Sequence, residues 1–134
     1  MDGKNRTAPV VCIVDDDESV RRALSRLLGS VGWRTETFAS PHEFLARAVE
    51  ERIACLLLDV QLPGMDGFQL RERVARAGVE TPVIFITSHG DPKTRARAAE
   101  TDAVAFLEKP FHDRALLDAL ETALARIADG DDVR

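Results

Sequence analysis

Cysteine is scarce in this sequence of 134 residues, and its two cysteines, Cys12 and Cys55, lie within apolar runs. Such thiols favour a reduced, cytoplasmic protein and argue against a disulfide framework. Long hydrophobic runs are also absent, since no apolar stretch approaches the roughly 18 residues that a membrane-spanning helix needs. The polar first six residues lack the apolar core of a secretory signal, so neither membrane insertion nor export is expected.

The sequence also has no excess of basic over acidic residues. The 18 Lys and Arg residues are outnumbered by 23 Asp and Glu residues, which gives a net charge of −5. Because no basic patch balances a phosphate backbone, direct binding of nucleic acid by this segment is not expected. The length suits one domain, and 45% hydrophobic with 31% charged residues is typical of a globular protein with a sizeable core.

Hydrophobic periodicity alternates along the chain between two patterns. Residues 10–14, 54–58 and 83–86 are continuous apolar runs, typical of strands that are buried on both faces. Residues 34–38 and 104–107 are strand-like but mixed, which favours positions at the edges of a sheet. The segments between these runs carry apolar residues at helical spacing, so each strand is expected to lead into a helix.

Short polar residues and a glycine mark the expected ends of these helices. Asp17, Asp66 and Asp113 each precede a helical stretch as an N-cap residue, and Asp91 with Pro92 opens another helix. Gly32 is expected to end the first helix. The helix after Asp91 is thinly anchored, because its inner face is predicted to consist of small residues, namely Ala96, Ala99 and Ala103.

Strands that alternate with helices predict βαβ units and therefore a parallel sheet. Three apolar strands inside and two mixed strands outside fit the flavodoxin-like α/β fold. This fold is a doubly wound (βα)5 arrangement, whose five parallel strands lie in the order 2-1-3-4-5. We expect a flexible N-terminal segment over residues 1–8, the domain over residues 9–128, and a polar tail or truncated linker over residues 129–134.

Polar side chains collect where the predicted strands end. In chain order they are Asp15 and Asp16, Asp59, Thr87 and Lys109. Since parallel strands end on one edge of a sheet, these side chains are expected on one rim. Clustered carboxylates repel each other, and their hard oxygen atoms suit Mg²⁺ or Mn²⁺ as the compensating ion. With a hydroxyl, a lysine and a carboxylate nucleophile beside it, such an ion predicts a phosphoryl-transfer site.

Four motifs at these strand ends resemble the receiver domain of two-component response regulators, over about residues 9–128. The motifs occupy residues 14–17, 58–67, 86–91 and 106–111. The His-Gly-Asp run after Thr87 and the Phe-Leu-Glu-Lys-Pro-Phe run are similar to the nitrogen-fixation regulator subgroup. The resemblance implies a phosphorelay module that catalyses its own phosphotransfer and dephosphorylation and turns over no external substrate.

By this resemblance, Asp59 accepts a phosphoryl group from a histidine kinase or a phosphotransfer protein and becomes an aspartyl phosphate. Asp15 and Asp16 position Mg²⁺, and Asp59 with the backbone carbonyl of Gln61 completes the protein ligands. The domain then switches its partner-binding surface. Its output is either stand-alone or carried by a DNA-binding domain outside this sequence.

The resemblance also assigns residues to the switch. Thr87 and Lys109 contact the phosphoryl group, and the Lys109–Pro110 peptide bond is cis. Phe106 occupies the switch-aromatic position, where the lack of a hydroxyl leaves burial alone to bias its two rotamers. Asp102 departs from the family pattern, because a glycine is usual there, and it predicts a different backbone in the loop before the last strand.

The helix after Asp91 has a second interpretation as a docking surface. Lys93, Arg95 and Arg97 make its outer side basic, which a solvated face explains as well as an interface does. The resemblance implies a homodimer through this helix, the last strand and the last helix. No membrane partner is expected.

Other functions fit the same residues less well. A receiver-like interaction scaffold that never takes phosphate remains the alternative, although the intact acidic set argues against it. A flavin-binding protein needs a phosphate loop after the first strand, where the aspartates at 15–17 would repel a phosphate. An aspartate-nucleophile phosphatase would want a second acid at the position of Gln61.

Overall fold

Five parallel strands form one sheet in the order β2-β1-β3-β4-β5, which confirms the predicted flavodoxin-like topology. The computed structural model describes residues 9–47 and 52–133, with side chains described as far as Arg126. The strands are β1 (Val10–Val14), β2 (Arg34–Phe38), β3 (Ile53–Asp59), β4 (Val83–Thr87) and β5 (Ala105–Glu108). The helices are α2 (Glu18–Ser30), α3 (Pro41–Arg47), α4 (Gly67–Arg76), α5 (Pro92–Ala99) and α6 (Asp113–Val133).

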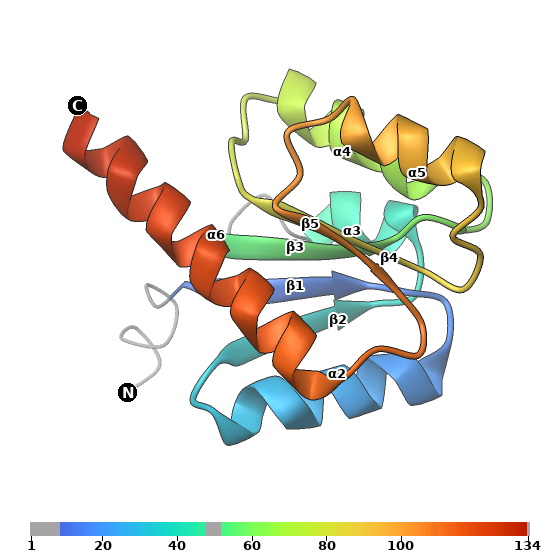
Figure 1. Ribbon diagram of the computed structural model, residues 1–134, viewed down its shortest axis with the longest axis horizontal. Coiled ribbons are helices and arrows are strands. Elements are labelled where there is room, and N and C mark those ends of the chain that lie inside the picture. Colours follow the sequence, from blue (N-terminus) through green and yellow to red (C-terminus); the bar gives the residue numbers. More distant parts are fainter. Residues whose placement is uncertain (1–8, 48–51, 134) are drawn as a thin grey trace.

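The helices cover both faces of the sheet, with α2 and α6 on one side and α3, α4 and α5 on the other (Figure 1). The two mixed strands, β2 and β5, lie at the edges as predicted, and the apolar strands lie between them. The predicted flexible segment 1–8 falls outside the described residues. Residues 129–133, predicted as a polar tail, continue α6 as helix.

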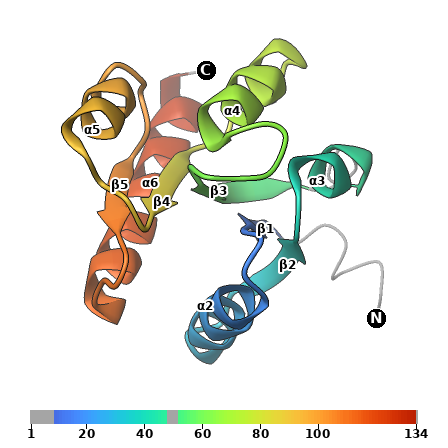
Figure 2. The ribbon, with the colours of Figure 1, turned by 90° about the vertical axis from the view of Figure 1, so that its right-hand side faces the viewer.

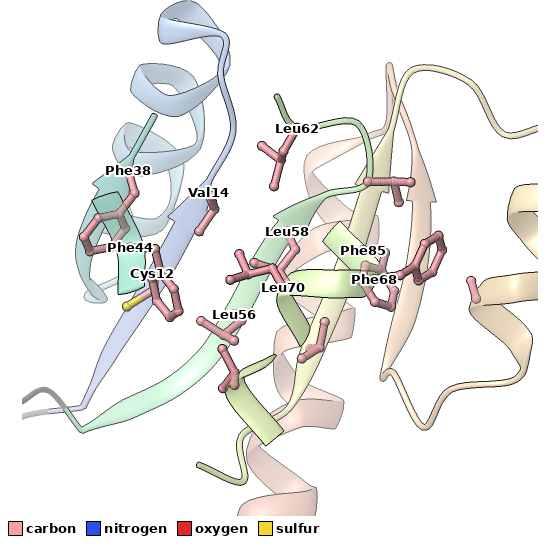
Figure 3. Packing of buried hydrophobic residues seen from close by; sticks show 14 of the residues in the cluster. Cys12, Val14, Phe38, Phe44, Leu56, Leu58, Leu62, Phe68, Leu70 and Phe85 are labelled. Atoms are coloured by element: carbon pink, nitrogen blue, oxygen red, sulfur yellow. The ribbon is translucent and has the colours of Figure 1, made fainter. Parts of the chain in front are cut away.

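Two hydrophobic clusters fill the space between the sheet and its helices. Successive side chains of a strand point to opposite faces, so neighbouring residues of β1 belong to different clusters. Cys12 belongs with Phe44 and Leu70 to the cluster under α3 and α4, part of which Figure 3 shows. Ile13, the next residue, packs with Leu28 under α2 and α6. Both cysteines are buried and neither forms a disulfide, as the sequence predicts. Within the described part of the chain, no helix is long and apolar enough to span a membrane.

Two of the three aspartates predicted as N-caps are confirmed. The side chains of Asp17 and Asp66 accept hydrogen bonds from backbone N–H groups at the starts of α2 and α4, and Asp91 does the same at the start of α5. The prediction for Asp113 is wrong, because this residue lies inside the first turn of α6, where the helix dipole still favours an acidic side chain. Gly32 follows the end of α2 with a φ of 97°, a left-handed conformation that favours glycine.

The predicted inner face of α5 is wrong in detail. Ala98 is the buried residue of this helix, whereas Ala96 and Ala99 are exposed. Because the alanines of this helix lie close together in sequence, more than one face of the helix could point to the core, and the pattern alone does not decide which face does. Arg95 and Arg97 select it here, since both reach from α5 to neighbouring elements. The helix is still thinly anchored, because its one buried side chain is a methyl group.

Candidate functional site

The polar residues that follow the strands meet on one edge of the sheet. Asp59 ends β3 and Thr87 ends β4, while Asp15 directly follows β1 and Lys109 directly follows β5. Parallel pairing aligns these ends, because Val14 lies beside Leu58 and the Thr87 position lies beside the last residue of β5. Figure 2 looks onto this edge, where the loops after β1, β3, β4 and β5 come together.

Lys109 bridges the two buried carboxylates of the site. Its Nζ lies 2.9 Å from Oδ2 of Asp15 and 3.3 Å from Oδ2 of Asp59. Asp15 is 0% exposed and Asp59 is 5% exposed, so both charges are largely removed from water. One ammonium group therefore compensates two buried carboxylates that are brought together from β1 and β3.

Backbone N–H groups orient the remaining carboxylate oxygens. Asp15 Oδ1 accepts a hydrogen bond of 2.9 Å from the N–H of Asp17, and Asp59 Oδ1 accepts one of 2.9 Å from the N–H of Gln61. Each carboxylate is thus held by one backbone donor and by the same lysine. Gly67 lies against the end of β3, where an added Cβ would stand 2.5 Å from the carbonyl oxygen of Asp59. A glycine is required there for the loop after β3 to close on the site.

The environment of the site shifts two pKa values. Burial, assisted by the charge of Asp15, raises the pKa of Asp59 to about 6, although the Gln61 N–H and Lys109 act against this shift. Burial lowers the pKa of Lys109, but its hydrogen bonds and charge attraction to Asp15 and Asp59 outweigh burial and raise that pKa overall. The site therefore holds a proton more readily than isolated carboxylates do and keeps its lysine charged.

The raised pKa of Asp59 predicts a pH dependence of stability. The folded chain binds this proton with a pKa of about 6, and the unfolded chain with its ordinary value of 3.8. As the pH is lowered, the folded state therefore takes up the proton before the unfolded state does. The free energy of unfolding should rise by about 1 kcal/mol when the pH is lowered from 7 to 5. Urea unfolding of the metal-free chain measures this, with Asp59→Asn as the control whose profile lacks the increment. An identical slope in both proteins would contradict the assignment to Asp59.

Asp16 adds a third carboxylate at the exposed side of the site. One carboxylate oxygen each from Asp15, Asp16 and Asp59 can be chosen so that all lie within 4.8 Å of one another. Three hard oxygen donors at this spacing fit Mg²⁺ or Mn²⁺, because these ions take oxygen ligands and keep several waters. The donor set therefore fits the cation that the sequence predicts.

Thr87 and His89 shape the neighbouring loop. The Thr87 hydroxyl accepts a hydrogen bond of 3.1 Å from the N–H of His89, so in this state it is turned toward its own loop. His89 Nδ1 lies 3.0 Å from Oε1 of Gln61, which joins the loop after β4 to the loop after β3. These contacts place Gln61 and His89 at the exposed margin of the site.

Phe106 and Arg95 connect β5 to α5. Phe106 packs against the cluster under α5, and the Arg95 guanidinium lies 5.7 Å from the centre of its ring. Arg95 also donates to Glu108 at 2.5 Å and to the carbonyl oxygen of Gly90 at 2.9 Å. The helix, the loop after Thr87 and the last strand are therefore linked by one arginine.

The loops that flank β5 bear on two further predictions. The Lys109–Pro110 peptide bond is cis, as the resemblance implies. The different backbone predicted at Asp102 is not a left-handed one, since no non-glycine residue in the described ranges has a positive φ. Asp102 instead pairs with Arg71 of α4, and its carbonyl oxygen accepts a hydrogen bond of 2.5 Å from Arg126 of α6.

Comparison with known proteins decides the family. A family model described as the response regulator receiver domain matches residues 11–121, which is most of the chain. This chain belongs to the response regulator receiver domain family. The match includes all four strand ends that build the acidic site.

Relatives of this receiver domain come from several regulators. It is 43% identical over 120 residues to nodulation protein W of Bradyrhizobium diazoefficiens, covering 90% of this chain and 53% of that protein. It is 37% identical to the transcriptional regulatory protein FixJ of Rhizobium meliloti, covering 91% of this chain and 62% of FixJ. A solved response regulator receiver protein from Burkholderia phymatum is 42% identical with a TM-score of 0.77, covering 88% and 96% of the two chains. The chain spans about half the length of the first curated relatives it matches.

The sequence predictions missed three residues around the site of the receiver domain. One is His89, whose contact with Gln61 depends on how two loops meet. Arg21 in α2 donates to the backbone of Asp15, and Arg95 covers Phe106. For Arg21, the one signal in the sequence is its place in the first turns of the helix that follows the acidic run.

Proposed function

We propose that this receiver domain accepts a phosphoryl group on Asp59 from a histidine kinase or phosphotransfer protein, as a step of two-component signal transduction. The observation that carries the proposal is the pairing of buried Asp15 and Asp59 through Lys109, with Asp16 close enough to share a cation. Buried like charges are costly, so a protein that collects them at one site is equipped for a charged ligand. The family membership supports the same conclusion.

In the proposed reaction, a carboxylate oxygen of Asp59 attacks the phosphorus atom of a phosphohistidine. The new O–P bond forms as the N–P bond of the donor breaks, and the imidazole keeps the electron pair and takes up a proton. Asp15, Asp16, Asp59 and the Gln61 carbonyl would hold Mg²⁺, which neutralises charge on the phosphoryl oxygens. The backbone N–H of Gln61 holds Oδ1 of Asp59, so the attacking carboxylate is oriented before the donor arrives.

Lys109 and Thr87 are proposed to contact the new phosphoryl group. Lys109 already lies beside Asp59 and would exchange part of its contact with Asp15 for a phosphoryl oxygen. The Thr87 hydroxyl would leave the N–H of His89 and turn toward the same group. This turn opens space beside β5 that Phe106 can enter, which changes the contacts of Arg95 and α5. The alternative of a scaffold that takes no phosphate is not favoured by this arrangement.

The thin anchoring of α5 makes it the part of the fold that responds most. Because Ala98 is its one buried residue, α5 costs the least to displace, and Arg95 transmits the movement of Phe106 to it. Phosphorylation should therefore change amide hydrogen exchange more over residues 92–99 than in any other helix. The exchange of α2, which is anchored by buried Leu24 and Leu28, is the internal control. Equal protection of α5 in both states would contradict this switch.

The same elements are proposed as the partner-binding surface. The helix α5, the strand β5 and the helix α6 adjoin along one side of the receiver domain (Figure 2). Leu124 of α6 is 42% exposed, an apolar side chain that a homodimer would cover. A regulator that includes this domain would in this way couple phosphorylation to self-association or to an output domain.

Acetyl phosphate tests the proposed chemistry without a kinase. With Mg²⁺ present, intact-mass spectrometry should show the addition of one phosphoryl group to the chain. With EDTA in place of Mg²⁺, the addition should be lost, because Lys109 alone then compensates the three carboxylates that face the phosphoryl donor. Failure of the Mg²⁺-loaded chain to gain mass would support the scaffold alternative.

A further inference from the structure

Arg21 reaches from α2 back to the acidic site. Its Nη1 donates a hydrogen bond of 2.7 Å to the backbone carbonyl oxygen of Asp15. The two residues are six positions apart, so the first turns of α2 fold over the end of β1. Arg21 is half-buried, and its outer side lines a surface hollow between α2 and β2.

Asp15 is fixed at each of its polar groups. Its backbone N–H donates to the carbonyl oxygen of Phe38 at 3.1 Å, and its two carboxylate oxygens accept from Asp17 and Lys109. Of these partners, Lys109 is the one that the proposed switch moves. The bond from Arg21 is the contact that holds the Asp15 peptide group on the side of α2, outside the reacting groups.

We infer that Arg21 is a positioning residue for the cation site, since it fixes the Asp15 peptide and thereby aims the Asp15 carboxylate toward Asp16 and Asp59. This inference rests on the proposed function, whose cation site it deepens. Ligands that are already ordered lose less conformational freedom when the ion binds. In metal sites, partners that orient a ligand typically change metal affinity by roughly 10- to 100-fold.

Positioning and charge act in opposite directions on cation binding. The guanidinium charge repels a divalent ion, so removing the charge alone would tighten binding. Losing the hydrogen bond from Arg21 to Asp15 would weaken cation binding. Arg22 provides the matched control, because it has the same charge on the same helix, is exposed and pairs with Glu18 at 2.7 Å.

The experiment compares Arg21→Met with Arg22→Met in the unphosphorylated chain. Methionine keeps much of the aliphatic stem and favours helix, and because Arg21 borders an open hollow, the change leaves no enclosed cavity. Mn²⁺ binding, followed by electron paramagnetic resonance, should be weakened by roughly 10-fold in Arg21→Met. Arg22→Met should bind as tightly as the wild type or slightly more tightly. Arg21→Lys, which keeps the charge and one donor, should recover part of the loss.

Two further readouts separate this role from general damage to the fold. In Arg21→Met, the Mg²⁺ concentration that half-saturates phosphorylation by acetyl phosphate should rise, while the rate at saturating Mg²⁺ stays near that of the wild type. The Asp17 N–H, which donates to Asp15, should exchange faster in Arg21→Met than in Arg22→Met. This second readout needs neither metal nor phosphate, so it tests Arg21 even if the wild type takes up neither.

Three results would overturn the inference. One is Mn²⁺ binding by Arg21→Met that equals or exceeds that of Arg22→Met. Another is a phosphorylation rate that falls by the same factor at every Mg²⁺ concentration. The last is equal exchange of the Asp17 N–H in both variants, which decides the matter if the wild type itself binds no Mn²⁺.

Discussion

Replacing Asp59 with asparagine is expected to abolish phosphoryl uptake and to leave the fold intact. The amide has no anionic oxygen to attack phosphorus, so acetyl phosphate with Mg²⁺ should add no mass to this variant. Stability should not fall, because Asp59 is 5% exposed and its burial raises the pKa to about 6, so that its charge costs free energy at neutral pH. We expect Asp59→Asn to be more stable than the wild type by roughly 2 kcal/mol at pH 8.

Asp66→Asn is the matched control for this variant. Asp66 is also an aspartate close to the loop after β3, but its carboxylate caps α4. This control should keep phosphoryl uptake, and its stability should change little, because asparagine also caps helices well. Phosphoryl uptake by Asp59→Asn equal to that of the control would place the acceptor elsewhere.

Replacing Lys109 with methionine is expected to give the largest loss of stability. The lysine side chain is 18% exposed and contacts both buried carboxylates, so its removal leaves Asp15 and Asp59 facing each other without a cation. Breaking a buried pair of this kind costs about 3 kcal/mol or more. The pKa of Asp59 should then rise further above about 6, since the attraction of Lys109 is lost.

The conditions of the measurement distinguish this cause from poor packing. Urea unfolding of Lys109→Met at pH 8 without metal should show the full loss. Lowering the pH to 5 should recover part of it through protonation, and millimolar Mg²⁺ should recover part of it through charge compensation. Lys93→Met, a change on an exposed residue of α5, is the control and should shift stability by less than about 0.5 kcal/mol. A loss in Lys109→Met that is the same at pH 5 and pH 8, with and without Mg²⁺, would contradict the charge argument.

The main elements of the fold could be predicted because its signals are local. The apolar runs at 10–14, 54–58 and 83–86 are long enough to identify buried strands, and their boundaries agree with β1, β3 and β4 to within one residue. The mixed runs identified the edge strands for the same reason. Once the order of a parallel sheet is fixed, the residues after its strands must share a rim, which brought Asp15, Asp59 and Lys109 together.

The errors arise where a local pattern leaves several choices. The alanines of α5 fit more than one phase, and the choice depends on Arg95 and Arg97, whose partners lie on other elements. Val31 continues the apolar stripe of α2 in sequence but is exposed, because the helix has ended at Ser30 before it. Arg21 could not be predicted as a site residue for a different reason, because an arginine on a helix is usually solvated.

The central claim is that Asp59 itself receives the phosphoryl group, and locating the modified residue tests it most directly. After treatment with acetyl phosphate and Mg²⁺, borohydride reduction converts an aspartyl phosphate to homoserine, which peptide mass mapping can assign. We predict homoserine at position 59 and unmodified aspartate at positions 15 and 16. Homoserine at another aspartate, or a phosphorylated chain with unmodified Asp59, would contradict this account.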